Sequence, residues 1–161
     1  MTADKTPFTV EVMQMIFDAI RHCKVLGITI DSVEGKQLTS KLPYSKKIVG
    51  NPATGVIHGG ALTTLLDTTC GMSVPIALGE FRISPTLDLR IDYMSAAKPN
   101  LDIYGRAEVY RITKNVVFSK GIAYQDDEHQ PIAHCVATFM LLPKDVADTD
   151  MVQHSIENLN D

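Results

Sequence analysis

A carboxylate, two glycines and a histidine in one short stretch are the residues of this sequence best suited to catalysis. Asp67 lies inside a strongly apolar segment, and His58 directly precedes Gly59 and Gly60, where that segment begins. An ionised carboxylate among apolar residues is unfavourable unless it is paired or faces a polar cavity. Asp67 therefore either pairs with a buried structural partner or lines a pocket as a general base or nucleophile.

The neighbours of Asp67 favour the pocket. Thr63, Thr64, Cys70 and Gly71 stand three and four positions away, and residues at these separations share one face of a helix. They are small or polar, so this stripe of the helix is narrow enough to admit a substrate. Thr64 is accordingly a candidate substrate-binding residue.

The two glycines lie where a loop becomes a helix. The first N–H groups of a helix have no partner inside it and carry a partial positive charge. Aimed at a carbonyl oxygen, such donors form an oxyanion hole, and glycine lets a ligand approach the backbone closely. Simple loop flexibility would explain Gly59 and Gly60 alone. Their combination with Asp67 favours the oxyanion hole, with Gly60 as a further substrate contact.

The spacing of Gly59 and Asp67 predicts a site shared between two chains. Eight positions along a helix span roughly 12 Å at ~1.5 Å per residue, whereas a hydrogen bond reaches about 3 Å. Two antiparallel central helices in a two-fold dimer would place Asp67 of one chain near Gly59 of the other. We therefore expect an obligate homodimer.

Two polar residues flank the glycines with less specific roles. His58 could hold the loop through hydrogen bonds or act as a general acid, and Asn51 could fix the loop or orient a water. The remaining histidines are scattered and lack the spacing of a metal site. The sequence has no GxSxG, P-loop or GxGxxG motif. We expect neither a metal nor a cofactor.

The first part of the chain predicts a helix followed by a hairpin. Thr6 is a candidate N-cap, and Pro7 suits the first helical position. Apolar residues then recur at helical spacing, and Gly27 would end the helix. Two strand-like pieces, residues 28–34 and 37–43, then flank a Gly-Lys pair, as in a β-hairpin.

The middle of the chain predicts a loop and one buried helix. Residues 44–60 are rich in Gly, Pro, Ser and Asn. Residues 60–78 are apolar nearly all round a helix, which is typical of a buried one. Gly71 and Pro75 predict fraying or a turn near its end.

Four strands are expected after this helix. Residues 86–93, 101–112, 116–126 and 131–142 are strand-like and separated by turn signals, which predicts an antiparallel meander. One buried helix against one long antiparallel sheet gives an α+β domain. An open sheet leaves an edge strand and an exposed face that a second subunit would cover.

Composition bounds the class of protein. The chain has 161 residues and a net charge of -4 without a basic cluster, which argues against nucleic-acid binding. Cys23, Cys70 and Cys135 form no CxxC pair, so we expect buried free thiols in a reducing compartment. Residues 1–12 lack a signal-peptide pattern, and no apolar run approaches the ~20 residues of a membrane-spanning helix. A cytoplasmic protein without a membrane partner is expected.

Three segments resemble one known family. The stretch NPATGVIHGGALTTLLDTT resembles the PaaI-like (phenylacetic-acid-pathway) branch of the hotdog-fold acyl-CoA thioesterases. The later segments PTLDLRIDYMSAAKP and PIAHCVATFMLLP look like the family's strand after the helix and its closing strand. This resemblance covers roughly residues 28–143. It implies a hotdog fold, in which an antiparallel sheet wraps one long central helix. An N-terminal helix (1–27) and a polar C-terminal tail (144–161) would complete the chain.

The resemblance also implies roles for the site residues. The N–H of Gly59 would polarise the thioester carbonyl, and Asp67 of the opposite subunit would activate water or attack directly. Asn51 and His58 would position substrate or water, and Thr86 would lie near the catalytic water. Coenzyme A would enter as part of the substrate along the dimer interface, and tetramers built from two dimers are common in the family.

Other activities remain open at this stage. A hotdog enoyl-CoA hydratase or dehydratase would also combine a carboxylate with an acyl thioester. A non-catalytic acyl-CoA binding module or a purely structural domain would need no turnover at all. Neither the acyl group nor the residues that hold the CoA phosphates follow from the sequence; the candidates by charge alone are Arg82, Lys98, Lys114 and Lys120.

Overall fold

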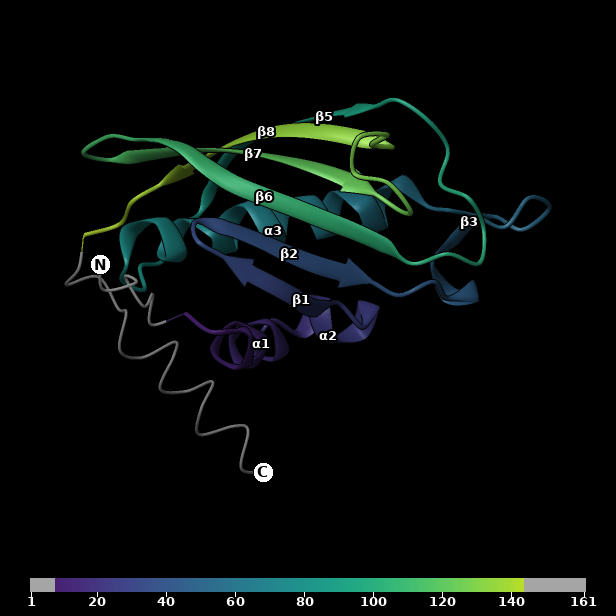
Figure 1. Ribbon diagram of the computed structural model, residues 1–161, viewed down its shortest axis with the longest axis horizontal. Helices are drawn as coiled ribbons and strands as arrows, with labels where there is room; N and C mark the ends of the chain where they lie inside the picture. Colours follow the sequence, from purple (N-terminus) through teal and green to yellow (C-terminus); the bar gives the residue numbers. More distant parts are fainter. Residues whose placement is uncertain (1–7, 144–161) are drawn as a thin grey trace.

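A six-stranded antiparallel sheet wraps one long helix, α3 (Gly59–Leu78), in the computed structural model, which describes residues 8–143 (Figure 1). Leu65, Leu66 and Val74 of this helix are fully buried. The predicted α+β hotdog architecture is therefore confirmed. The predicted tail, residues 144–161, lies outside the described residues.

The central helix does not fray where the sequence predicted. It continues through Gly71 and Pro75 and ends at Gly79, whose left-handed conformation (φ 72°) is suited to glycine. Pro75 is buried, and a side chain at Gly71 would meet the Phe139 ring at 3.3 Å. Close packing against the sheet therefore keeps this segment helical despite the two residues that disfavour a helix.

The sequence predicted no apolar run long enough to cross a membrane, and α3 corrects this prediction. The length and apolar composition of α3 would suffice to cross a membrane. Within the described residues, however, the sheet covers it, and 56% of the apolar window is buried inside the domain. This burial is typical of the core helix of a soluble globular domain.

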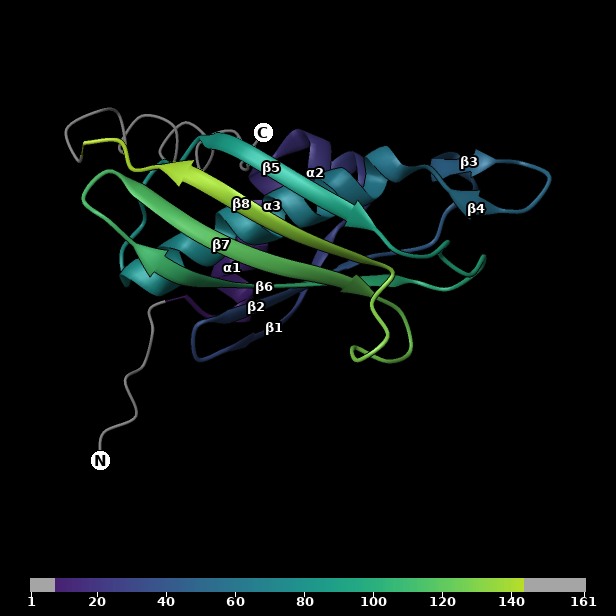
Figure 2. The same cartoon turned by 90° about the horizontal axis from the view of Figure 1, so that it is seen from above.

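The sheet order corrects one predicted pairing. The strands are β1 (Thr29–Glu34), β2 (Gln37–Leu42), β5 (Thr86–Tyr93), β6 (Ile103–Ile112), β7 (Val116–Tyr124) and β8 (Ala133–Met140), in the spatial order β1-β2-β6-β7-β8-β5. The β1–β2 hairpin is confirmed, and β6, β7 and β8 form a meander as predicted. β5 does not precede β6 in the sheet. β2 occupies that side of β6, so β5 pairs with β8 at the far edge (Figure 2).

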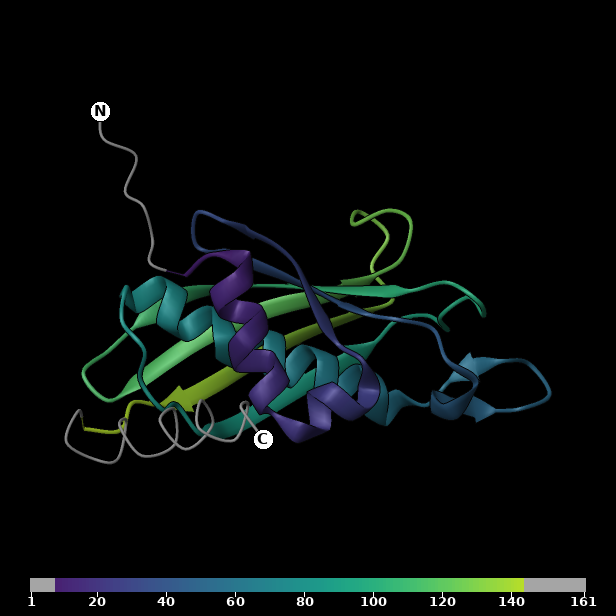
Figure 3. The ribbon, with the colours of Figure 1, turned by 90° about the horizontal axis from the view of Figure 1, so that it is seen from below.

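Two short helices replace the single predicted N-terminal helix. α1 (Val10–Ala19) and α2 (Arg21–Leu26) are separated by Ile20, which has an extended backbone (ψ 96°). The break turns α2 onto α3, as Figure 3 shows from below. Gly27 ends α2 in the left-handed conformation, as predicted.

The start of α1 also differs from the prediction. Thr9 is the N-cap, and its side chain accepts a hydrogen bond from the N–H of Val12 at 3.4 Å. The predicted cap, Thr6, and Pro7 lie outside the described residues.

The predicted loop before α3 contains a small hairpin. A 3-10 turn, η1 (Lys46–Ile48), leads into β3 (Val49–Asn51) and β4 (Val56–Ile57), which extend from one end of the molecule (Figure 1). Strands of three and two residues are too short to show the two-residue periodicity on which a sequence prediction depends.

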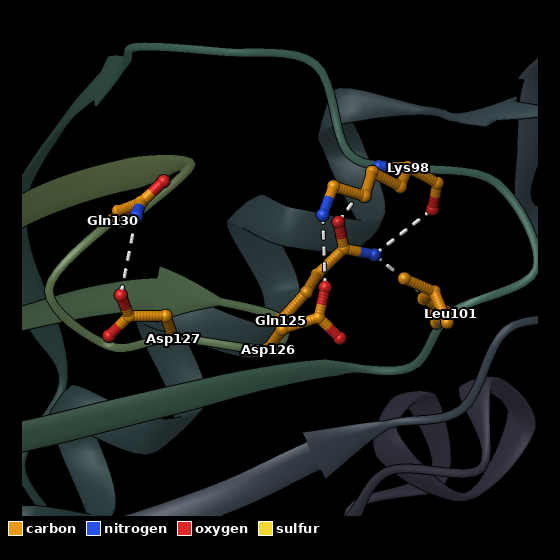
Figure 4. Close-up of polar contacts among 6 residues, drawn as sticks. All are labelled: Lys98, Leu101, Gln125, Asp126, Asp127 and Gln130. Carbon is orange, nitrogen blue, oxygen red and sulfur yellow. Dashed lines mark hydrogen bonds and ion pairs between the residues drawn. The ribbon is translucent and has the colours of Figure 1, made fainter.

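A buried glutamine fixes the connection between β5 and β6. The Gln125 side chain donates to the carbonyls of Lys98 (3.0 Å) and Leu101 (3.2 Å) and accepts from the N–H of Lys98 (2.8 Å) (Figure 4). Pro99 of this connection packs on the β3–β4 hairpin, where a side chain at Gly55 would meet it at 2.9 Å. Gln125 therefore also supports the hairpin that leads into α3.

Replacing Gln125 with glutamate is expected to lower the free energy of unfolding by about 1–3 kcal/mol, because a carboxylate oxygen would face two carbonyl oxygens without a proton to donate. Urea denaturation measures the change. The matched control is Gln130→Glu in the exposed turn that follows, where the Gln130 side chain makes only a 3.4 Å contact with the Asp127 carboxylate. Equal effects of the two substitutions would contradict this role of Gln125.

Candidate active site

Asp67 and Thr86 come together at the open side of α3. Asp67 is half-buried, and Thr86 at the start of β5 donates its hydroxyl hydrogen to Asp67 Oδ1 at 3.0 Å. No described residue donates a hydrogen bond to the second carboxylate oxygen, Oδ2. This arrangement fixes the orientation of the carboxylate and leaves one oxygen free to act on a bound molecule.

A cavity of about 420 Å³ surrounds this carboxylate. It has the size of a small-molecule site, and α2, α3 and β5 line it. The lining residues are Ile20, His22, Cys23, Thr63, Thr64, Asp67, Thr68, Thr86 and Leu89. The predicted residues Asp67, Thr64 and Thr86 therefore share one cavity.

The predicted narrow stripe on α3 is only half correct. Thr63 and Thr64 line the cavity. Cys70 and Gly71 face the sheet instead, where Cys70 Sγ lies 3.5 Å from the sulfur of Cys135. Thr63 and Cys70 lie seven residues apart and so share nearly one face of α3, as do Thr64 and Gly71. The spacing alone did not show that the sheet covers only the later part of this stripe.

The contribution of α2 was missed in the sequence. His22 Nε2 lies 3.2 Å from Thr64 Oγ1, and the Cys23 thiol lies 3.5 Å from Thr68 Oγ1. The scattered histidines gave no signal, because only the fold of α2 onto α3 brings His22 to the cavity. Burial raises the pKa of the Cys23 thiol, so this sulfur remains a neutral lining atom.

The start of α3 is organised by His58. His58 is the N-cap, and its Nδ1 accepts a hydrogen bond from the Gly60 N–H at 2.9 Å. The N–H of Ala61 bonds to the His58 carbonyl at 3.0 Å. Among the described residues none accepts a hydrogen bond from Gly59, so its N–H is the open donor at this end of the helix. The Gly60 N–H, which we predicted to contact substrate, is already engaged.

Replacing His58 with alanine is expected to lower the free energy of unfolding by about 1 kcal/mol, the usual effect of losing an N-cap. Asparagine is a good N-cap, so His58→Asn is expected to recover most of this loss. Thermal or urea denaturation compares the three proteins. Equal stability of the alanine variant and the parent would show that the bond to Gly60 contributes nothing.

Asn51 lies apart from the cavity. Its Oδ1 accepts from the N–H of Ala53 at 3.1 Å, and its carbonyl accepts from Gly55 at 2.8 Å. Asn51 is exposed at the end of β3 and forms the hairpin turn. Asn51 was expected either to fix the loop or to orient a water, and its hydrogen bonds within one chain fit the first role.

Tyr93 is a further residue that the sequence reading did not select. Its hydroxyl donates to the Gly59 carbonyl at 3.1 Å and lies 2.9 Å from Thr63 Oγ1. Leu89, Ile91 and Tyr93 occupy every second position of β5. Because side chains of a strand point to alternate faces, all three lie on the α3 side of the sheet. This shared face is the sequence pattern from which the position of Tyr93 could have been predicted.

The remaining thiols are structural. Cys70 and Cys135 are free and buried, and the contact between them, with burial, raises the pKa of Cys70 well above its ordinary value. A neutral thiol is a poor nucleophile, so Cys70 does not compete with Asp67. No group of three metal-binding side chains occurs within residues 8–143.

A second cavity, of about 200 Å³, lies on the outer face of the sheet. Its charged lining is largely paired: Lys120 contacts Glu108 at 3.0 Å, and Arg106 pairs with Glu128. Lys120, a candidate by charge for the CoA phosphates, borders it, whereas none of the predicted catalytic residues does. Among residues 8–143, the predicted catalytic carboxylate therefore borders the first cavity and not the second.

The fold and this site define the class of the protein. The sequence model of the thioesterase superfamily matches residues 54–132, which include α3 and Asp67. Over these residues the chain is therefore similar to the thioesterase superfamily, and its fold is the hotdog fold.

Individual relatives are consistent with this class. A Pseudomonas aeruginosa protein of known structure is 56% identical, with a TM-score of 0.76 over 83% of this chain and 98% of that one. A phenylacetic acid degradation-related protein from Ralstonia eutropha is 28% identical, with a TM-score of 0.65 over 75% of this chain and 89% of its own. The structural neighbours thus include the PaaI-like type that the sequence resembles.

A curated relative from Halobacterium salinarum, assigned as an esterase, is 30% identical over 94 residues, which are 56% of this chain. The match spans 61% of that relative's length.

Proposed function

We propose that this protein hydrolyses the thioester of a small aromatic or medium-chain acyl-CoA. The observation that carries this proposal is the half-buried Asp67 carboxylate, held on one oxygen by Thr86 in a cavity of about 420 Å³. It lies in the part of the chain that is similar to the thioesterase superfamily. Thioester hydrolysis needs a carboxylate and an oxyanion donor but no metal or cofactor beyond the CoA of the substrate.

Each residue has a defined part in this reaction. The N–H of Gly59 donates to the thioester carbonyl and stabilises the negative charge that develops on its oxygen. Asp67 activates a water or attacks the carbonyl carbon. Thr86 keeps one carboxylate oxygen occupied, so the other faces the reaction. His58 holds the start of α3 in place.

The two catalytic groups meet across a dimer. Gly59 and Asp67 lie eight residues apart on one straight helix, a separation of roughly 12 Å along its axis. Gly59 and Asp67 of the same chain therefore cannot both contact one thioester carbonyl group. A two-fold arrangement of antiparallel α3 helices joins Gly59 of one chain to Asp67 of the other.

The edge strand β5 supplies a surface for this dimer. It pairs with β8 on one side only, and Leu87 and Tyr93 near its ends are 52% and 53% exposed. An unpaired edge of this length invites a second strand. Pairing of β5 with its copy would extend the sheet and close the open side of the Asp67 cavity.

Replacing Leu87 with aspartate is expected to raise the dimer dissociation constant at least about tenfold, because a charge would enter an apolar contact. The isolated subunit should stay folded, since Leu87 is exposed in it. Sedimentation analysis compares this variant with Ile112→Asp, which changes a residue 45% exposed on β6. Equal dimerisation of both variants would argue against pairing through β5.

The cellular setting follows from the same features. Three free buried thiols within the described residues support a reducing compartment, so we place the protein in the cytoplasm. A tetramer formed from two dimers would fit the family resemblance. No nucleic acid or membrane has a part in the proposed reaction.

Thiol release from a panel of acyl-CoAs tests the proposed function. The panel runs from acetyl to palmitoyl and includes phenylacetyl and hydroxybenzoyl esters. We expect turnover of at least one aromatic or medium-chain ester. Hydration of crotonyl-CoA without thiol release would instead identify a hydratase, and tight binding of CoA esters without turnover would identify a binding module.

A further inference from the structure

Four cations of α2 and η1 have no ion-pair partner among residues 8–143. Arg21 and Lys24 of α2 and Lys46 and Lys47 of η1, here called the basic cluster, are all exposed. The ion pairs among residues 8–143 involve five other cations: Lys41, Arg90, Lys98, Arg106 and Lys120. Lys36, Arg82, Arg111 and Lys114 form no ion pair within this range either, but none of them lies on α2 or η1.

Hydrogen bonds connect the α2 part of the cluster to the start of α3. His22, next to Arg21, contacts the hydroxyl of Thr64, and that hydroxyl donates to the Gly60 carbonyl at 3.1 Å. The N–H of Gly60 in turn bonds to His58. Arg21 and Lys24, three positions apart on α2, occupy one face of that helix.

The η1 part of the cluster joins the same end of α3. The N–H of His58 donates to the carbonyl of Ile48, which directly follows Lys47, at 2.8 Å. A side chain at Gly27, just after α2, would meet Pro43, just before η1, at 3.3 Å. α2 and η1 therefore flank the start of α3 (Figure 3). This is the end of the helix at which the Gly59 N–H is the open donor.

The cations that charge alone suggested are less suited to bind an anion here. Lys98 pairs with Asp126 and Lys120 with Glu108, both at 3.0 Å. Arg82 donates to the Leu142 carbonyl and follows the opposite end of α3. Lys114 lies in the β6–β7 turn, at the other end of the molecule from the β3–β4 hairpin (Figure 2).

We propose that the basic cluster binds the phosphate groups of the substrate's nucleotide, the diphosphate and the 3′-phosphate of coenzyme A. This inference rests on the proposed function. A thioester carbonyl bound at the Gly59 N–H lies at the end of α3 that α2 and η1 flank, so the nucleotide end of the substrate leaves the site between them. Lysine and arginine side chains are the usual partners of phosphate.

Substrates with and without phosphates test the cluster. Lys46→Glu combined with Lys47→Glu is expected to raise KM for an acyl-CoA at least about tenfold at low ionic strength, because two attractions to phosphate become repulsions. kcat should stay unchanged. KM for the same acyl group on pantetheine, which lacks phosphates, should also stay unchanged. The matched control, Lys36→Glu with Lys114→Glu, changes two lysines outside the cluster by the same charge.

Two results would overturn the proposal. One is an unchanged KM for the acyl-CoA in the Lys46 and Lys47 variant. The other is an equal rise for the acyl-pantetheine, which would indicate a general disturbance of the site. If the parent hydrolyses neither ester, the proposed function fails, and calorimetry with adenosine 3′,5′-bisphosphate then decides on the cluster alone. If the Lys46 and Lys47 variant loses binding of the bisphosphate and the Lys36 and Lys114 control keeps it, the proposal is supported. Equal binding by these two proteins refutes the proposal.

Discussion

Asp67→Asn is expected to lower kcat for acyl-CoA hydrolysis by at least about a hundredfold, the low end for loss of general-base assistance, with little change in KM. The amide keeps the size of the side chain and can still accept the hydrogen bond from Thr86, but it neither takes a proton from water nor attacks the thioester. Thiol release under saturating substrate measures the change. Asp88→Asn, on the exposed part of β5, is the matched control.

Activity within a few-fold of the parent would remove Asp67 from the mechanism. A variant that loses stability or assembly, while the parent shows no turnover of any ester, would support the structural alternative. In that case the contact of Thr86 with Asp67 would be a polar link between β5 and α3.

Gly59→Pro is expected to lower kcat by about 10²–10³-fold, the range for loss of one oxyanion donor. Gly59 is the first residue of α3, a position where proline suits the helix and its missing N–H breaks no helical bond. The preceding residue, His58, has the extended backbone that proline requires (φ -69°, ψ 134°). The substitution therefore removes the open donor and leaves the helix in place.

Gly59→Ala is the control for this experiment. It keeps the N–H and adds the same β-carbon, which would meet the Tyr93 hydroxyl at 3.4 Å. The alanine variant should retain most of the activity that the proline variant loses, in a thiol-release assay with circular dichroism to check the fold. Equal activities of the two variants would mean that the oxyanion is stabilised elsewhere.

The local pattern of apolar and polar residues predicted the helix that contains the candidate catalytic carboxylate. The apolar run from Gly60 onwards identified α3, because a helix that is apolar all round has to be buried. The sequence position of Asp67 within it identified the carboxylate. Thr86 came from the family resemblance, and its hydrogen bond to Asp67 now gives that residue a physical connection to the site.

Contacts between segments far apart in the chain could not be predicted from the sequence. β5 pairs with β8 because β2 already lies beside β6, and no local pattern encodes that competition. α2 reaches the cavity because the chain breaks at Ile20, a residue whose type favours neither helix nor break strongly. Tyr93 could have been found from its parity with Leu89 and Ile91.

Mixed dimers of the two inactive variants test the shared site most directly. In a dimer of one Asp67→Asn chain and one Gly59→Pro chain, one site combines an intact Gly59 with the intact Asp67 of the partner subunit. We expect each mixed dimer to have about half of the parental kcat. Because about half of the dimers are mixed after equal amounts of the two variants are unfolded and refolded together, the mixture should show about a quarter of the parental activity. Activity no greater than the sum of the separate variants would contradict a site built from both chains.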